Sequence, residues 1–295
     1  MKNKKIISAI FLSVIVFSTC FIISCTREKV ETDFQNDVAE YAPLFEINEK
    51  EYEERQADSV EPEREAETPE ETIQSEENIP EEIKEESYIT YLTSITDGLN
   101  VRKGAGTQYA SIGKIDEGDV VMCLGEEGDF FQTYYRGGIA YVSKKYTKKI
   151  TMEKADESIE NVIKEGAMLL GTPYVYGAVR LHDGEGHFYA NFDKNKFDCS
   201  SLMQYIFYKG KGTLLQVNTR TQVYQGVNVE KENLKRGDLL FFTNASRLNK
   251  TGIERIGHVG LYLGDGYMLH TASDYAVIEK ISSLRWSYFI CARRV

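Results

Sequence analysis

The sequence predicts an acidic segment followed by two folded units: a small all-β barrel and an α+β domain with an antiparallel sheet and helices. Residues 88–150 alternate short β-rich runs with glycine-containing turns, a pattern typical of a small barrel. Residues 151–295 start with helical periodicity and continue with strand-like runs, which favours α+β over alternating α/β units. Residues 26–87 offer few apolar side chains to bury, so we expect them to be a disordered tether.

The net charge of −11 comes from that one segment. Residues 28–87 carry 23 acidic and 5 basic side chains, whereas residues 88–295 carry 23 acidic and 26 basic ones. Like charges extend a chain, which suits a spacer. The small basic excess of residues 88–295 is not gathered into a stripe, and this argues against a nucleic acid as partner.

The N-terminus has the pattern of an export signal. A lysine-rich start at residues 2–5 precedes an apolar run at residues 6–23, and a serine then precedes Cys25. This arrangement resembles the lipobox of bacterial lipoproteins, which implies that residues 1–25 hold the signal and that Cys25 carries lipid. An uncleaved membrane anchor is the alternative, since the apolar run is just long enough to span a bilayer. Both alternatives place the rest of the chain outside the cytoplasm.

Residues 98–107 read GLNVRKGAGT, and residues 115–121 and 138–142 add two further motifs. Together they resemble bacterial SH3-like domains. The resemblance implies an SH3-like barrel at residues 88–150 that binds cell-wall peptides or shapes the substrate cleft of an attached peptidase. The expected strands are Tyr88–Thr93, Gly98–Arg102, Ala110–Ile115, Asp119–Leu124, Phe130–Tyr135 and Ile139–Val142.

Residues 151–295 contain two apolar stripes with helical spacing. The first spans residues 159–170 and stops at Gly171; the second begins at Cys199, and Gly210 is placed to end it. The expected strands are Leu239–Thr243, His258–Leu263, Tyr267–Thr271, Ala276–Lys280 and Ser287–Arg293.

Cys199 lies in the first turn of the second helix, on its apolar stripe, and Asp198 is placed to cap that helix. A thiol in this position meets unpaired backbone N–H groups and the positive end of the helix dipole, which lower its pKa below the usual value of about 8.5. Cys199 is therefore a candidate nucleophile, and a buried structural cysteine is the alternative. Cys123 and Cys291 lie in apolar runs and are expected to be small core residues.

Two of the four histidines, His258 and His270, lie on one expected hairpin. Cysteine nucleophiles need a base and a group that orients the base. His258 would take the proton of the Cys199 thiol and later give it to the leaving amine, while His270 would orient His258. A histidine held only by strand contacts is the alternative for His270.

The turn of this hairpin decides whether the two histidines share a face. A three-residue turn at residues 264–266 places Leu263 opposite Tyr267. His270 then lies opposite Gly260, and the histidines become diagonal neighbours roughly 7–8 Å apart. A two-residue turn would send His270 to the other face, so we expect the longer turn.

Six segments follow one another in the order of a known family: residues 171–177 (GTPYVYG), 197–201 (FDCSS), 220–221 (RT), 236–242 (RGDLLFF), 257–264 (GHVGLYLG) and 269–272 (LHTA). They resemble the NlpC-type peptidases, papain-like cysteine endopeptidases of the bacterial cell wall. The resemblance implies a papain-like fold for residues 151–295, a thiol mechanism without cofactor or metal, and a catalytic set of Cys199, His258 and His270. It also implies cleavage of the peptidoglycan stem peptide between D-glutamate and the diamino acid, meso-diaminopimelate or L-lysine.

The resemblance suggests substrate-binding roles for three further residues. In members that carry a preceding SH3-like domain, the Asp and Ser beside the nucleophile often help to hold the free amine of an N-terminal L-alanine. Asp198 and Ser200 match these two residues. Tyr174 matches a tyrosine that lines the cleft. A helix cap and a first-turn polar residue are the alternatives for Asp198 and Ser200, and core packing is the alternative for Tyr174.

The chain departs from the family at three positions, Tyr176, Ala178 and Ser201, where the family often has Trp, Gly and Gly. The segment 178–197 is longer than usual and contains His182 and His187. Long loops beside a nucleophile often tune substrate access. The spacing of these two histidines gives little support for a metal site.

These features predict a monomeric, lipid-anchored peptidoglycan endopeptidase of the cell envelope. Its partners would be stem peptides or muropeptides and, through Cys25, a membrane. Two alternatives stay open: an N-acetylmuramoyl-L-alanine amidase with similar chemistry, and a non-catalytic cell-wall-binding protein. The sequence leaves open the diamino acid, the choice between intact wall and free muropeptides, and the identity of the membrane.

Overall fold

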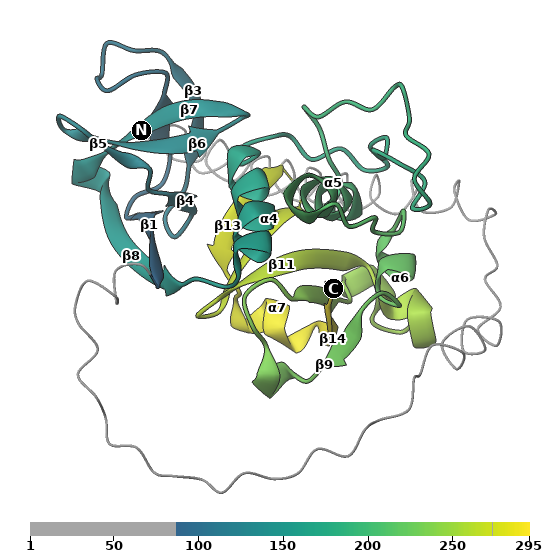
Figure 1. Cartoon of the computed structure of the whole chain (residues 1–295). Coiled ribbons are helices and arrows are strands. Elements are labelled where there is room, and N and C mark those ends of the chain that lie inside the picture. Colours follow the sequence, from purple (N-terminus) through teal and green to yellow (C-terminus); the bar gives the residue numbers. More distant parts are fainter. Residues whose placement is uncertain (1–86, 273) are drawn as a thin grey trace, which may run out of the picture. The chain divides into compact units, whose positions relative to one another are not determined.

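The computed structural model describes residues 87–272 and 274–295 (Figure 1). The signal expected at residues 1–25, with its lipid-attachment residue Cys25, and residues 26–86 of the expected tether lie outside the described residues. In the described part of the chain, no helix is both long and apolar enough to cross a membrane.

The first sheet has five antiparallel strands in the order β3-β2-β7-β6-β5. Buried and more exposed side chains alternate along most of β2, β6 and β7, as expected for strands that bury one face. One short strand, β5, was not expected because two of its three residues are exposed glutamates. The strands are β2 (Leu99–Arg102), β3 (Ser111–Ile115), β5 (Gly125–Glu127), β6 (Phe130–Tyr135) and β7 (Gly138–Ser143).

The second sheet has nine strands in the order β8-β1-β4-β13-β12-β11-β10-β14-β9. The segment before residue 154 supplies β1 (Tyr88–Ser94), β4 (Val120–Met122) and β8 (Thr147–Glu153). The later segment supplies β9 (Val227–Val229), β10 (Leu239–Phe242), β11 (His258–Gly264), β12 (Tyr267–Ala272), β13 (Tyr275–Lys280) and β14 (Phe289–Arg294). The two groups meet where Val120 pairs with Ile278. One sheet therefore runs through both segments, which local sequence patterns do not reveal.

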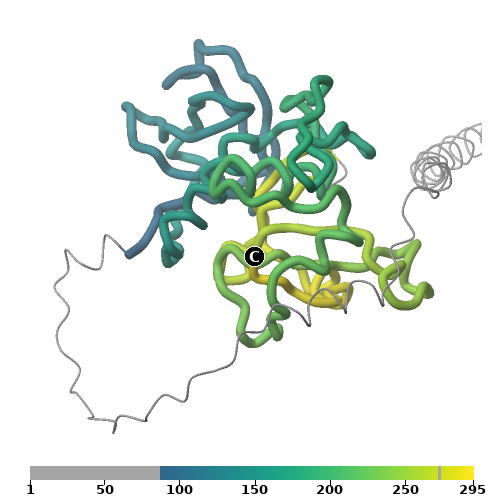
Figure 2. The backbone as a smooth tube through the Cα atoms, turned by 45° about the vertical axis from the view of Figure 1, so that its right-hand side comes forward, coloured from purple at the N-terminus to yellow at the C-terminus, as the bar shows by residue number. Residues whose placement is uncertain are grey.

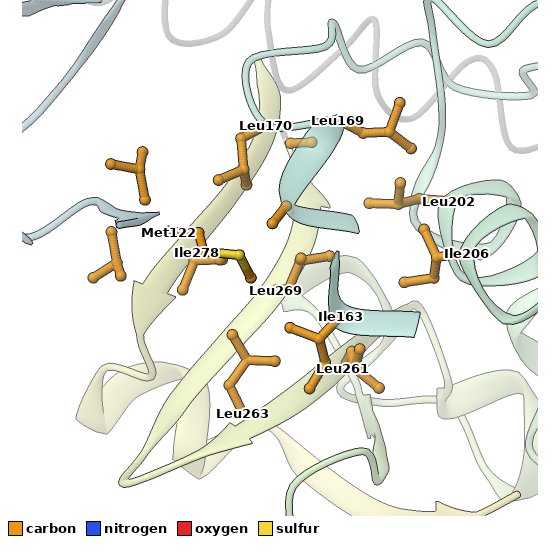
Figure 3. Packing of buried hydrophobic residues seen from close by; sticks show 14 of the residues in the cluster. Met122, Ile163, Leu169, Leu170, Leu202, Ile206, Leu261, Leu263, Leu269 and Ile278 are labelled. Atoms are coloured by element: carbon orange, nitrogen blue, oxygen red, sulfur yellow. The ribbon is translucent and has the colours of Figure 1, made fainter. Parts of the chain in front are cut away.

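Two helices pack against each other and against β11 and β12: α4 (Glu157–Met168) and α5 (Cys199–Lys211). Ile163 of α4 and Leu202 and Ile206 of α5 meet Leu261 and Leu269 of the sheet in one buried cluster (Figure 3). Burying a side chain of this size contributes about 1.5–3 kcal/mol. The cluster therefore holds the start of α5 against β11.

The end of α5 corrects one expectation. Gly210 does not end the helix; it lies in the last turn, where a Cβ atom would clash with the backbone nitrogen of Val162 in α4. Gly210 is thus required by the close approach of two helices. The helix ends instead at Gly212, whose φ of 73° lies in the left-handed region that favours glycine.

The hairpin of β11 and β12 reaches the expected register by an unexpected route. Leu261 lies opposite Leu269, as expected, but Gly264 rather than Leu263 lies opposite Tyr267. The turn therefore contains two residues, not three, and a bulge at Leu263 absorbs the difference. The prediction that a two-residue turn would misplace His270 was wrong, because the bulge restores the register.

The remaining elements are short. They are α6 (Thr219–Gln222), α7 (Ser283–Ser287), η1 (Lys144–Tyr146), η2 (Lys231–Asn233), η3 (Ala245–Arg247) and η4 (Gly252–Arg255). Ser287 ends α7 rather than starting the last strand. The connection between α4 and α5, residues 169–198, contains no regular helix or strand, and its path can be followed in Figure 2.

Candidate active site

Cys199 is the first residue of α5, as expected. Asp198 is the N-cap: its carboxylate accepts a hydrogen bond of 2.8 Å from the backbone N–H of Ser201. The Ser201 hydroxyl in turn accepts from the Asp198 N–H at 2.9 Å, which completes a capping box. Ser201 therefore fixes the helix start and, with it, the position of the thiol.

The thiol environment corrects the expected pKa. Burial, followed by the negative charge of Asp198, raises the pKa of Cys199 to about 12. Backbone N–H groups of Val259 and Ser200 and the charge of Arg180 act in the opposite direction without overcoming these effects. The helix start therefore does not produce a free thiolate, and a base must remove the proton.

A series of hydrogen-bonding groups contains the candidate base, His258. His258 Nε2 lies 3.0 Å from His270 Nδ1, and His270 Nε2 lies 2.9 Å from Glu279 Oε1. The hydrogen bond from His270 lowers the pKa of Glu279, so this carboxylate is ionised and can only accept. His270 therefore carries its proton on Nε2, and its Nδ1 accepts from His258 Nε2–H. The lone pair of His258 is left on Nδ1.

Both rings are buried, and burial lowers the pKa of each, that of His258 well below its usual value. At His270, the hydrogen bond to Glu279 and the negative charge of Glu279 partly oppose the lowering of the pKa by burial. At neutral pH the site holds a neutral thiol and two neutral imidazoles. A nucleophilic thiol in this setting would have to lose its proton during attack rather than before it.

The packing of α5 on β11 brings the predicted catalytic residues into one region. The Cys199 thiol lies beside the backbone N–H of Val259, the residue that follows His258. Gly260 leaves room for His270, since a Cβ atom at this position would lie 3.1 Å from the Cβ of His270. Gly260 therefore has the spacing role expected from the sequence.

Tyr174 lies next to the nucleophile. It forms a bridge with Phe197, two residues before Cys199. Burial, followed by the charges that Cys199 and Asp198 carry when ionised, raises the pKa of its phenol. The residue remains partly exposed, so it could contact a molecule bound at Cys199.

Asp198 and Ser200 have a partner that the sequence did not predict. Arg180 Nη1 lies 2.7 Å from Asp198 Oδ2, and Arg180 Nη2 lies 3.0 Å from Ser200 Oγ. The arginine comes from the long segment 178–197, and nothing in its immediate sequence marks it. Glu279 was missed for the same reason, because β13 meets β12 only in the folded chain.

His182 and His187 do not form a shared site. The His182 ring is buried between Phe188 and Tyr208, and its Nδ1 accepts from the Gly184 N–H. The exposed His187 ring instead pairs with Asp183 at 2.7 Å. Asp183, Glu185 and His187 have ligand atoms within 4.8 Å of one another, and His182 is not part of this group.

Comparison with known families identifies both folded parts. Residues 171–295 match the NlpC/P60 family, and residues 97–148 match the bacterial SH3 domain. These matches agree with the papain-like α+β domain and the SH3-like barrel expected from the sequence.

Curated relatives include a dipeptidyl-peptidase and a peptidoglycan endopeptidase. The gamma-D-glutamyl-L-lysine dipeptidyl-peptidase of Bacillus subtilis (strain 168) is 30% identical over 59% of this chain and 53% of its own length. The peptidoglycan DL-endopeptidase CwlO of Bacillus licheniformis is 32% identical over 49% of this chain and 29% of its own length. The chain thus spans about half or less of these relatives.

Among solved structures, an NlpC/P60 family protein from Bacillus cereus ATCC 10987 is similar over 70% of this chain and 63% of that chain. The two are 22% identical, with a TM-score of 0.37. The domain assignment rests on the family matches. The chain therefore carries a bacterial SH3 domain followed by an NlpC/P60 domain.

Proposed function

We propose that the chain is a peptidoglycan endopeptidase that cleaves stem peptides between D-glutamate and the following diamino acid. The observation that carries this proposal is the hydrogen-bonded series His258–His270–Glu279 beside a cysteine at a helix start. The relatives named for the γ-D-glutamyl-L-lysine bond and for peptidoglycan DL-endopeptidase activity support the choice of bond.

The proposed reaction has two stages. His258 Nδ1 takes the Cys199 proton while the sulfur attacks the γ-carbonyl carbon of D-glutamate. The C–N bond then breaks, and the imidazolium of His258 gives its proton to the amine of the diamino acid. His258 then takes a proton from a water molecule, whose oxygen attacks the thioester carbonyl. The C–S bond breaks, the γ-carboxyl product of D-glutamate leaves, and the imidazolium of His258 returns its proton to the Cys199 sulfur. Glu279 stabilises the positive charge shared by the two imidazoles during both stages.

The regions outside the NlpC/P60 domain have proposed roles as well. Lipid on Cys25 would hold the protein at a membrane, and residues 26–87 would let the catalytic part reach the wall from there. The SH3 domain would position the stem peptide. The protein would act outside the cytoplasm, as a monomer.

The test is incubation of the full-length chain with peptidoglycan fragments that contain either meso-diaminopimelate or L-lysine, with products read by mass spectrometry. Fragments cut on the carboxyl side of D-glutamate support the proposal, provided that Cys199→Ala abolishes them. Release of intact stem peptides from the glycan would instead identify an amidase. Wall binding without any cleavage, and without reaction of Cys199 with thiol reagents, would identify a binding protein.

A further inference from the structure

The guanidinium of Arg180 is fixed against the residues that flank the nucleophile. Besides Asp198 and Ser200, it donates to the carbonyl oxygens of Val217, at 2.7 Å, and of Ala178. Its side chain is 19% exposed and that of Asp198 is 6% exposed. A half-buried arginine with four hydrogen-bond partners has a fixed geometry beside the nucleophile.

Arg180 already occupies hydrogen-bonding positions on both residues that flank the nucleophile. One oxygen of Asp198 accepts from the Ser201 N–H and the Ser200 hydroxyl, and the other accepts from Arg180. The Ser200 hydroxyl donates to Asp198, and its oxygen accepts from Arg180. An incoming ammonium group would have to compete with the guanidinium for the same oxygens and would meet its positive charge.

The local charges lead to the same conclusion. Asp198 and Arg180 both act on the Cys199 thiol, the first raising its pKa and the second lowering it. Glu279, at the far end of the histidine pair, is bonded to His270 and lies 3.5 Å from Arg285. The carboxylates of Asp198 and Glu279 each already have an arginine as partner. A cationic substrate group would instead need a carboxylate without a cationic partner.

Resting on the proposed function, we infer that Arg180 is a specificity residue that takes the place of a substrate ammonium group at Asp198 and Ser200. The favoured substrates are stem peptides whose L-alanine nitrogen is an uncharged amide, as it is while the peptide is attached to the glycan. Free peptides with an N-terminal ammonium are disfavoured. The enzyme would therefore act as an endopeptidase on attached stem peptides rather than by removing N-terminal dipeptides.

The test compares two substrates in one protein: the tripeptide L-Ala-γ-D-Glu-diamino acid and its N-acetylated form. For the unaltered full-length chain, we expect kcat/KM to be at least ~10-fold higher for the acetylated peptide, because the guanidinium repels an ammonium group. Arg180→Ala should raise the free-to-acetylated ratio of kcat/KM by ~10-fold or more. The ratio is independent of the fraction of protein that folds, since both substrates report on the same molecules.

Two controls separate charge from loop structure. Arg180→Lys keeps the positive charge and should keep the preference for the acetylated peptide. Lys194→Ala removes a cation from the same loop and should leave the ratio unchanged. Equal or better cleavage of the free peptide by the unaltered chain, or an unchanged ratio in Arg180→Ala, would overturn the inference alone. Cleavage of neither peptide nor of isolated peptidoglycan would overturn the proposed function and this inference with it.

Discussion

Glu279 Oε1 accepts a hydrogen bond of 2.9 Å from His270 Nε2, and the same oxygen lies 3.5 Å from Arg285 Nη2. The carboxylate comes from β13 and reaches a histidine on the neighbouring strand β12. This contact determines the proton positions along both histidines, because an ionised carboxylate cannot donate. Glu279 is thus a positioning residue that acts on the base through His270.

Glu279→Gln should lower kcat/KM on peptidoglycan fragments by ~10- to 100-fold, the range typical of groups that orient a catalytic ligand or base. The amide removes the negative charge that favours an imidazolium, and its NH₂ group permits the wrong tautomer of His270. Steady-state kinetics measures the loss, and thermal unfolding should show a nearly unchanged Tm. Glu254→Gln, the same change on η4, serves as the matched control and should retain full activity. Full activity of Glu279→Gln would mean that His270 is oriented without it.

The raised pKa of Cys199, about 12, predicts how the thiol reacts in the absence of substrate. Alkylation requires the thiolate. The rate of reaction of Cys199 with iodoacetamide should therefore rise ~10-fold per pH unit between pH 7 and 10, because the thiolate fraction rises tenfold per unit below the pKa. Site-resolved mass spectrometry distinguishes Cys199 from Cys123 and Cys291. A rate that levels off below pH 8 would instead reveal a preformed thiolate–imidazolium pair.

The positions of the catalytic residues could be predicted to different degrees. The start of α5 at Cys199 follows from its apolar stripe and from the capping residue Asp198, both of which are local. The bulge at Leu263 could not be predicted, since the turn sequence alone is compatible with two or three residues. The prediction of a lowered pKa for the Cys199 thiol was wrong. Burial, which is a property of the packed domain, raises the pKa by more than the helix start lowers it. Arg180 and Glu279 were missed because their partners are distant in sequence.

Gly260→Ala should impair the hairpin that carries both histidines. A Cβ atom at this position would clash with the sulfur of Met268 and lie 3.1 Å from the Cβ of His270. Overpacking of this kind costs about 1–3 kcal/mol of unfolding free energy, and here it also displaces a catalytic side chain. Urea denaturation and kinetics should both show a loss. Gly125→Ala is the matched control, because no atom lies within 4 Å of the added Cβ there; equal effects of the two changes would exclude a specific role for Gly260.

Arg236 holds the hairpin bulge to α4 and β1. Its guanidinium donates to the Leu263 carbonyl at 2.7 Å, to the Tyr91 hydroxyl at 2.7 Å, and to both carboxylate oxygens of Glu160 at 2.6 and 2.9 Å. The Arg236 side chain is only 5% exposed. Leu263 is the bulged residue, so this arginine supports the register that places His270 opposite Gly260.

Arg236→Met should lower the free energy of unfolding by about 3 kcal/mol, because it leaves the half-buried Glu160 carboxylate without its charged partner and with only the Ala155 N–H as donor. The double variant Arg236→Met/Glu160→Leu should recover part of this loss, since it removes both charges. It should not recover kcat/KM, because the Leu263 carbonyl still lacks its donor and the bulge is less constrained. Lys149→Ala, which breaks an exposed pair with Glu126, is the control and should leave Tm unchanged. Full recovery of kcat/KM in the double variant would show that the bulge keeps its register without Arg236.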